Sequence, residues 1–304
     1  MRYFVLLTAL LCWAIPATTY ELPAPRAEML RSTDWVAERL GQEKLVIVHV
    51  AEDRTQYDEA HVPGARFLPW SAVAQKRNGV IGMLPPTEEL VETFQDLGID
   101  ADSTVVFYDE EGGFRAARAF LALDYLGASD NAALMDGHWP LWQRESHPVS
   151  DTPPPPGEPG SMQPSLRPFV IGVNMMQDVV WLNSSGHDTY HLFDARPSEQ
   201  FRGTKPGDGI ERAGHIPGAA NVFWQETVKS MEEPVFRSVP DLLALYGLTD
   251  IRPHAAQIVT YCRTGGQGAH AYFTLRYLGF HPVLYDGSYI EWQSHPHLPV
   301  SQVE

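Results

Sequence analysis

Cys262 stands in a stretch whose residue types suit nucleophilic chemistry. It follows the apolar run QIVTY and precedes a short loop, which consists of Arg263, Thr264, Gly265, Gly266, Gln267 and Gly268. Glycines let such a loop curl so that successive backbone N–H groups point at one anion. The helix predicted directly after the loop adds the partial positive charge of its N-terminus, and the arginine adds a full charge. A buried structural cysteine needs none of these features. We therefore predict a reactive thiolate at Cys262 and an active-site loop over 263–268.

The composition excludes several classes of partner. The 304 residues carry 22 basic and 38 acidic side chains, a formal net charge of −16. Such an acidic chain is poorly suited to nucleic acid or anionic lipid. Beyond the N-terminal segment, no apolar run reaches the length that spans a bilayer. We expect a monomer that binds no nucleic acid and does not insert stably into a membrane.

The first 20 residues have the layout of a secretory signal peptide. One arginine precedes an apolar run, and small residues follow Pro16. That order of charge, apolar stretch and small residues is typical of exported proteins. Removal of residues 1–20 takes Cys12 with it, so Cys262 becomes the single cysteine of the mature chain and cannot form an intrachain disulfide. We expect a periplasmic or secreted protein.

The chain repeats one pattern in two halves. His-Val-Pro-Gly-Ala at His61 matches His-Ile-Pro-Gly-Ala at His215. VVFYDEEGGFRAARAFLALDYLG matches IVTYCRTGGQGAHAYFTLRYLG, and LMDGHWPLWQ matches LYDGSYIEWQ. Three matched blocks in the same order indicate a tandem duplication. In the first half, Asp109 stands at the position of Cys262.

Apolar and amphipathic runs alternate in both halves. We predict strands at 45–50, 104–108, 132–136, 190–195, 257–262 and 282–287, and helices at 85–98, 113–127, 239–248 and 268–279. This alternation predicts an α/β fold in which each half is a parallel sheet covered by helices on both faces. Four consecutive prolines within residues 151–168 predict an extended linker between domains at 21–150 and 169–304. Cys262 then stands at the carboxyl end of a strand, where such sheets place their sites.

These stretches together resemble the rhodanese superfamily of sulfurtransferases, over nearly the whole mature chain. The likeness is to the two-domain thiosulfate and 3-mercaptopyruvate sulfurtransferases, and it rests on FDARPSEQFRGTKPGDGIERAGHIPGAANV, YCRTGGQGAHAYFTLRYLG and YDGSYIEW. It implies tandem rhodanese-like domains, of which only the second is catalytic, because the carboxylate of Asp109 cannot accept a sulfane sulfur. It also implies that a small anionic donor leaves its sulfur on Cys262 as a persulfide, which a thiol or cyanide then takes. The family's reaction needs no metal or organic cofactor.

The chain differs from the family at positions whose side chains bind the substrate. Both types usually carry an arginine at the position of Gln200, and the mercaptopyruvate type carries another at that of Gly207. Three arginines remain as candidates for binding the donor: Arg202, Arg212 and Arg263. For Arg202 the alternative is that it only covers an inter-domain surface, and for Arg212 the alternative is a similar place on the surface.

Other polar residues near the motifs have structural explanations. Asp194 and Arg196 match the family's Asp-x-Arg at a strand end, and we interpret them as an ion pair that steadies the loop near the site. His61 and His215 are predicted to fix a turn through hydrogen bonds to backbone. His270 is predicted to lie on the helix surface, with an influence on the thiol as the alternative.

Two other functions compete with catalytic sulfur transfer. A cysteine-dependent phosphatase needs an arginine six positions after the cysteine to bind phosphate, and Gly268 stands there. A non-catalytic module that carries persulfide sulfur to a protein partner, or only binds one, is favoured by the missing substrate arginines. The intact loop favours catalysis.

Overall fold

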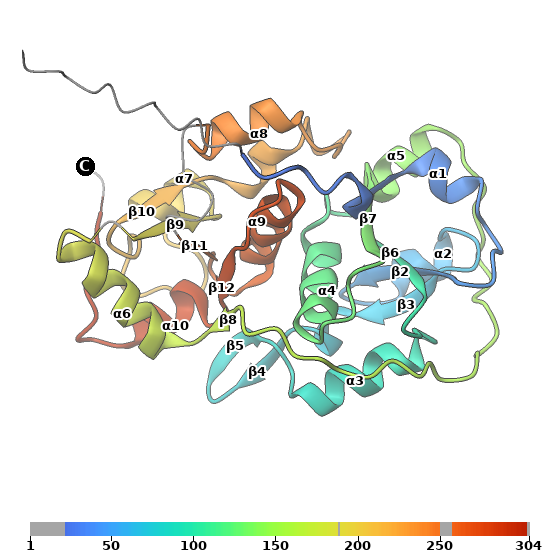
Figure 1. Cartoon of the computed structure of the whole chain (residues 1–304), viewed down its shortest axis with the longest axis horizontal. Helices are drawn as coiled ribbons and strands as arrows, with labels where there is room; N and C mark the ends of the chain where they lie inside the picture. Colours follow the sequence, from blue (N-terminus) through green and yellow to red (C-terminus); the bar gives the residue numbers. More distant parts are fainter. Residues whose placement is uncertain (1–21, 188, 250–256, 303–304) are drawn as a thin grey trace, which may run out of the picture.

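The computed structural model describes residues 22–187, 189–249 and 257–302. The expected signal peptide, residues 1–20, lies outside these residues. The described chain forms two halves, each built on a five-stranded sheet (Figure 1). No helix in the described part of the chain is both long enough and apolar enough to cross a membrane.

All strands of the two large sheets run parallel. The first sheet has the order β1-β7-β6-β2-β3, with strands β1 (Leu30–Ser32), β2 (Leu45–Ala51), β3 (Arg66–Pro69), β6 (Thr104–Tyr108) and β7 (Ala132–Asp136). The second has the order β10-β9-β11-β12-β8, with strands β8 (Val170–Ile171), β9 (Tyr190–Asp194), β10 (Ala219–Asn221), β11 (Gln257–Tyr261) and β12 (Val283–Tyr285). Taken in chain order, the strands occupy the same places in both sheets, which confirms the duplication.

Helices connect the strands in the same way in both halves. The first half contains α1 (Thr33–Ala37), α2 (Thr55–Glu59), α3 (Thr87–Asp96), α4 (Phe114–Tyr125) and α5 (His138–Arg144). The second half contains α6 (Val173–Ser184), α7 (Ser198–Arg202), α8 (Val239–Leu245), α9 (Gly266–Tyr277) and α10 (Ser288–Ser294). Short 3-10 turns complete the described helices: η1 (Ala27–Met29), η2 (Trp70–Ala72) and η3 (Trp224–Thr227).

Alternate residues of the central strands enter two different cores. In β6, Val105 and Phe107 join the core that contains α3 and α4, whereas Val106 and Tyr108 join the core that contains α1, α2 and α5. Successive side chains of a strand point to opposite faces, so a continuous apolar run requires cover on both sides. Each sheet therefore has helices on both faces, as predicted.

The two halves share one of these cores. Helices α4 and α9 lie side by side between the two sheets (Figure 1). Phe120 of α4 meets Phe273 of α9 edge to face, with ring centroids 4.9 Å apart. Nearly every residue of α9 is buried, because the helix has its own sheet on one side and the first half on the other. This explains why the sequence of α9 lacks a polar face.

The domain interface also contains a reciprocal exchange of hydrogen bonds. The Asp136 carboxylate accepts the Phe236 N–H at 2.9 Å. The matching carboxylate of the second half, Asp286, accepts the Leu84 N–H at 2.8 Å. Each half thus supplies an aspartate, at the end of the same strand, that holds a backbone N–H of the other half.

The proline-rich segment 151–168 is extended and runs along the first half, without regular secondary structure. Its backbone N–H groups at Gly160, Ser165 and Arg167 donate to carbonyls of the first half. Met162 is buried in the shared core. Proline cannot donate, so these few non-proline residues provide the attachment.

The structure corrects several predicted boundaries. The short edge strands β1, β3, β8 and β10 were not predicted, nor was the hairpin of β4 (Gln75–Arg77) and β5 (Val80–Met83). Strand β11 ends at Tyr261, so Cys262 lies one residue beyond the strand instead of closing it. Edge strands of two to four residues are too short to show a periodic pattern.

Replacement of Asp136 tests the charge at the interface. Burial raises the pKa of this carboxyl to about 6, above the value near 4 of an unfolded chain. The folded state therefore binds the proton more tightly, and the charge destabilises it increasingly as pH rises from about 4 through 6. Asp136→Asn keeps an acceptor for Phe236 without the charge. We expect it to raise the free energy of unfolding at pH 8 by about 1 kcal/mol, with the gain shrinking toward pH 4.

Thermal unfolding of both proteins from pH 4 to pH 8 measures this difference. Asp178→Asn, at an exposed position of α6, is the control and should change little. A gain that did not depend on pH would contradict the assignment.

Candidate active site

Cys262 lies between the end of β11 and the start of α9, and only 1% of it is exposed. Its N–H donates to the Ser288 hydroxyl at 3.2 Å. Its carbonyl accepts the Tyr289 N–H at 2.9 Å. Both partners belong to the first turn of α10, so this helix fixes the backbone of the cysteine. The structure thus places the thiol at the carboxyl edge of the parallel sheet.

The loop after Cys262 brings a backbone donor to the sulfur. The Gly265 N–H donates to the Sγ of Cys262 at 3.1 Å. Gly265 has φ +90°, a left-handed conformation that other residues adopt at a cost. It is also the N-cap of α9, so the sulfur faces the positive end of a twelve-residue helix. This arrangement stabilises a negative charge on the sulfur.

The matching loop of the first half shows what such a loop holds. Asp109 takes the place of the cysteine, and its carboxylate accepts four backbone N–H groups at 2.8–3.0 Å, those of Glu111, Gly113, Arg115 and Ala116. The loop is therefore an anion-binding cradle, and in the first half the protein's own carboxylate fills it. Gly113, the N-cap of α4, donates to Asp109 as Gly265 donates to Cys262.

Arg263 is placed beside the two positions where the family's arginines are missing. A β-carbon added to Gly207 would lie 2.9 Å from Cδ of Arg263 and 3.0 Å from Oε1 of Gln200. The Arg263 guanidinium donates to the Asp208 carbonyl at 2.9 Å and lies 3.7 Å from the Asp208 carboxylate. About a third of the Arg263 side chain is exposed. Arg263 thus occupies the space that a side chain at position 207 would need.

The other two candidate arginines have structural partners. Arg202 donates to the hydroxyl of Ser198 at 3.0 Å and is exposed. Arg212 donates to the carbonyls of His295 and Leu298 at 2.8 and 2.6 Å. The structure therefore ties Arg212 to the segment that follows α10.

Asp194 and Arg196 form a fully buried ion pair. Nη2 of Arg196 lies 2.6 Å from Oδ2 of Asp194, and Nε lies 2.9 Å from Oδ1. The same guanidinium donates to the Gly214 carbonyl and lies over the Tyr289 ring at 4.0 Å. These contacts join the end of β9 to the helix that fixes Cys262, which is a structural arrangement.

The His-x-Pro-Gly-Ala motifs also have structural contacts. Nδ1 of His61 donates to the Tyr57 carbonyl at 2.6 Å, and Nδ1 of His215 donates to the Phe201 carbonyl at 2.9 Å. The predicted hydrogen bonds to backbone are thus confirmed.

The structure corrects the predicted location of His270. It is fully buried, not on the helix surface, and its ring stacks on Phe236 and packs beside Trp224. Burial lowers the pKa of this imidazole to about 3. Both rings belong to the same half as His270 but lie far from it in the sequence, so the helix pattern alone could not reveal that they cover this face.

The first half contributes residues that the sequence did not indicate. Gly82 of the β4–β5 hairpin lies so close to the Thr264 carbonyl that any β-carbon there would collide with it. Trp70 and Phe114 contact the loop at Gly266. The hairpin and these rings thus form one wall of the active-site loop.

Arg118 fixes that wall in place. Its guanidinium lies 2.8 Å from the Asp286 carboxylate, with both side chains buried, and donates to the Gly82 carbonyl at 2.7 Å. A β-carbon at Gly265 would lie 3.1 Å from the same guanidinium. An arginine within the apolar stretch of α4 was the available signal, but its partner is far away in the sequence.

Comparisons with known proteins identify the family of the chain. A model of the rhodanese-like domain matches residues 32–145 and again residues 178–295. The sulfur carrier protein TtuD of Thermus thermophilus is 33% identical over 292 residues, which cover 91% of this chain and 98% of that one. The thiosulfate sulfurtransferase of Corynebacterium glutamicum is 33% identical over 298 residues, which cover 91% of each chain.

A solved structure extends the likeness. The crystal structure of SseA from Escherichia coli, a 3-mercaptopyruvate sulfotransferase, aligns with a TM-score of 0.72 and 25% identity, over 86% of this chain and 98% of that one. The chain therefore belongs to the rhodanese family, as a two-domain sulfurtransferase.

Gly265→Ala tests the donor to the sulfur. Alanine disfavours φ +90° by about 1 kcal/mol or more, and its methyl group would press on Arg118. Both effects move the N–H away from Sγ, so we expect kcat/KM for sulfur transfer to fall at least about tenfold. Gly186→Ala is the matched control, since Gly186 has φ +81° and open space around it. Full activity of Gly265→Ala, measured with thermal unfolding of both variants, would contradict the role of this N–H.

Proposed function

We propose that this protein moves a sulfane sulfur from thiosulfate or 3-mercaptopyruvate to a thiol or cyanide, through a persulfide on Cys262. The observation that supports it most is the position of Sγ, which receives the Gly265 N–H at 3.1 Å in front of helix α9. A nucleophilic thiolate needs such stabilisation.

In the first half-reaction, the Cys262 thiolate attacks the outer sulfur of the donor. With thiosulfate, the S–S bond of the donor breaks and sulfite leaves with the electron pair. With 3-mercaptopyruvate, the C–S bond breaks and the carbon fragment takes up a proton to become pyruvate. In both cases a new S–S bond joins the transferred sulfur to Sγ.

The first half suggests which groups hold the persulfide. Both Asp109 oxygens accept N–H groups, two of them from the first turn of α4. The corresponding groups in α9 belong to Gln267 and Gly268. We expect these amides to stabilise the outer sulfur of the persulfide, because they are already oriented before the sulfur arrives. An acceptor thiolate or cyanide then attacks that sulfur and restores the Cys262 thiolate.

Among the three candidate arginines, Arg263 is the best placed to bind the anionic sulfur donor. It borders the loop, is partly exposed and fills the space beside Gly207. Arg212 is held by backbone carbonyls, which leaves Arg202 as the alternative. The nearby Asp208 carboxylate limits the positive charge, so the site combines one guanidinium with the loop amides.

A second candidate function is that of a sulfur carrier for a protein partner. The missing arginines at Gln200 and Gly207 favour it, and the relative TtuD is named a sulfur carrier protein. In that case the persulfide forms on Cys262 but is delivered to a partner protein.

We further propose that the protein acts in the periplasm or after secretion. The layout of residues 1–20 supports this proposal, and the intact mass of the protein from its native source tests it. A mass that includes these residues would contradict export with cleavage.

Intact mass spectrometry tests the covalent intermediate. The protein is incubated briefly with thiosulfate, and separately with 3-mercaptopyruvate, before cyanide is added. We expect a gain of one sulfur atom, located on Cys262 by peptide mapping, and its loss to cyanide. Cys262→Ser should gain none and still fold, because the serine hydroxyl fits the same space.

The outcomes separate the two functions. Sulfur gain followed by turnover with free acceptors supports the transferase. No gain from either small donor would overturn the transferase and favour a carrier that is loaded by a protein. Gain of sulfur by Cys262→Ser would show that another residue is the nucleophile.

Arg263→Ala tests the donor site. Loss of a charge-assisted hydrogen bond of about 1.5–3 kcal/mol should lower kcat/KM for the donor by about 10- to 100-fold, mainly through KM. Arg202→Ala is the comparison variant and should change KM less than threefold. A larger effect of Arg202→Ala would assign the donor to Arg202 instead.

A further inference from the structure

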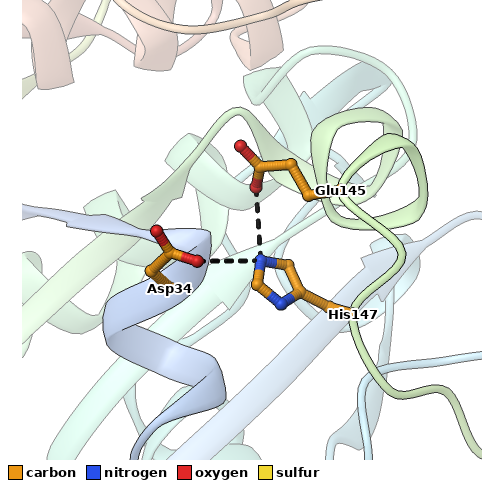
Figure 2. Close-up of side chains that lie close together, drawn as sticks. All are labelled: Asp34, Glu145 and His147. Atoms are coloured by element: carbon orange, nitrogen blue, oxygen red, sulfur yellow. Dashed lines mark hydrogen bonds and ion pairs between the residues drawn. The ribbon is translucent and has the colours of Figure 1, made fainter.

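Three potential metal ligands meet on the first half, within the part of the chain that is not catalytic. Asp34 is the second residue of α1, Glu145 is the C-cap of α5, and His147 follows two residues later. Figure 2 shows both carboxylates directed at Nε2 of His147. Segments more than 100 residues apart in the sequence supply them, so the fold brings them together.

The distances between these atoms differ from those of good ion pairs. Nε2 of His147 lies 3.4 Å from Oδ1 of Asp34 and 3.2 Å from Oε2 of Glu145. Charge-assisted N–H···O bonds measure about 2.7–2.9 Å. Tetrahedral Zn²⁺, with bonds of about 2.0–2.2 Å, separates its ligand atoms by about 3.3–3.5 Å. All three ligand atoms lie within 4.8 Å of one another, so a small movement suffices to close the site.

The surroundings orient two of the three ligands. The buried Thr33 donates its hydroxyl to Oε2 of Glu145. The His147 ring packs on Trp142 with centroids 4.6 Å apart, and only 13% of the side chain is exposed. Partners of this kind hold metal ligands in place before the ion binds.

The charges at this place lack a permanent counter-ion. Within the described residues, His147 is the only basic side chain that lies within 4.0 Å of either carboxylate. One imidazole nitrogen has a single N–H or a single lone pair, so it cannot serve two carboxylates equally well. A divalent cation at the point where the three atoms converge would balance both negative charges.

We propose that Asp34, Glu145 and His147 bind one Zn²⁺ ion. One imidazole and two carboxylates suit Zn²⁺, whereas Mg²⁺ and Ca²⁺ prefer oxygen ligands alone. Solvent completes the coordination. The ion links the start of α1 to the end of α5, and its effect is on the stability of the first half.

The duplication supplies an internal control. In the second half, the second residue of α6 is Asn174, the C-cap of α10 is His295, and His297 follows two residues later. The imidazole is present there, but both carboxylates are replaced. His297→Ala therefore removes a histidine from the corresponding place without touching the proposed site.

Calorimetric titration with ZnCl2 and thermal unfolding test the proposal. All proteins carry Cys262→Ser, so that no thiolate competes for the metal. We expect one Zn²⁺ per chain and a higher Tm with the metal. His147→Ala and Asp34→Asn should each weaken binding at least about tenfold and abolish the rise in Tm, whereas His297→Ala should leave both unchanged. Mg²⁺ should give no rise.

Several results would overturn the proposal. One is the absence of a stoichiometric Zn²⁺ site in the Cys262→Ser protein. Another is a loss of Zn²⁺ binding in His297→Ala that equals the loss in His147→Ala. Asp34→Asn keeps the size of the side chain at an exposed position, so it remains informative if His147→Ala folds poorly. Unchanged binding in Asp34→Asn would also reject the site.

Discussion

A buried ion pair between Arg118 and Asp286 joins the two domains at the back of the active-site loop. Such a pair adds little net stability compared with apolar packing, but the loss of one partner leaves a buried charge uncompensated. Its geometric effect is therefore the more important one. Through Arg118, the hairpin of the first domain is held at Gly82 against Thr264. The loop that surrounds Cys262 thus has one wall that its own domain does not provide.

The two halves show one anion-binding loop used in two ways. In the first half, the carboxylate of Asp109 accepts the N–H groups of its own loop. In the second half, the sulfur of Cys262 accepts the corresponding N–H of Gly265. The loop and helix geometry is a property of the fold, and one residue decides whether the cradle holds a carboxylate or a sulfur atom. The duplicated chain therefore has the same cradle twice, once around a carboxylate and once around a thiol.

Much of the secondary structure, and the position of Cys262 within it, could be predicted from local sequence patterns. The strands at 104–108 and 132–136 were predicted with their observed bounds, since continuous apolar runs are strong signals. The position of Cys262 at the carboxyl end of a strand followed from the order of strand, loop and helix. The edge strand β8, with two residues, has no periodicity to detect. His270 was wrongly predicted to lie on the helix surface, because the helix pattern does not show that Trp224 and Phe236 pack over it.

The sequence by itself determined the duplication, the fold class, the family and the residue at which sulfur chemistry is expected, because each depends on residue types at short, repeated spacings. Only the tertiary structure decided which groups surround that residue. Gly82, Arg118 and Asp286 meet across the domain interface, although more than 160 residues separate Arg118 from its partner along the chain. Likewise, Asp34 and His147 meet only after α1 has packed beside α5. Contacts of this kind depend on how whole elements pack, and no local pattern in the sequence encodes them.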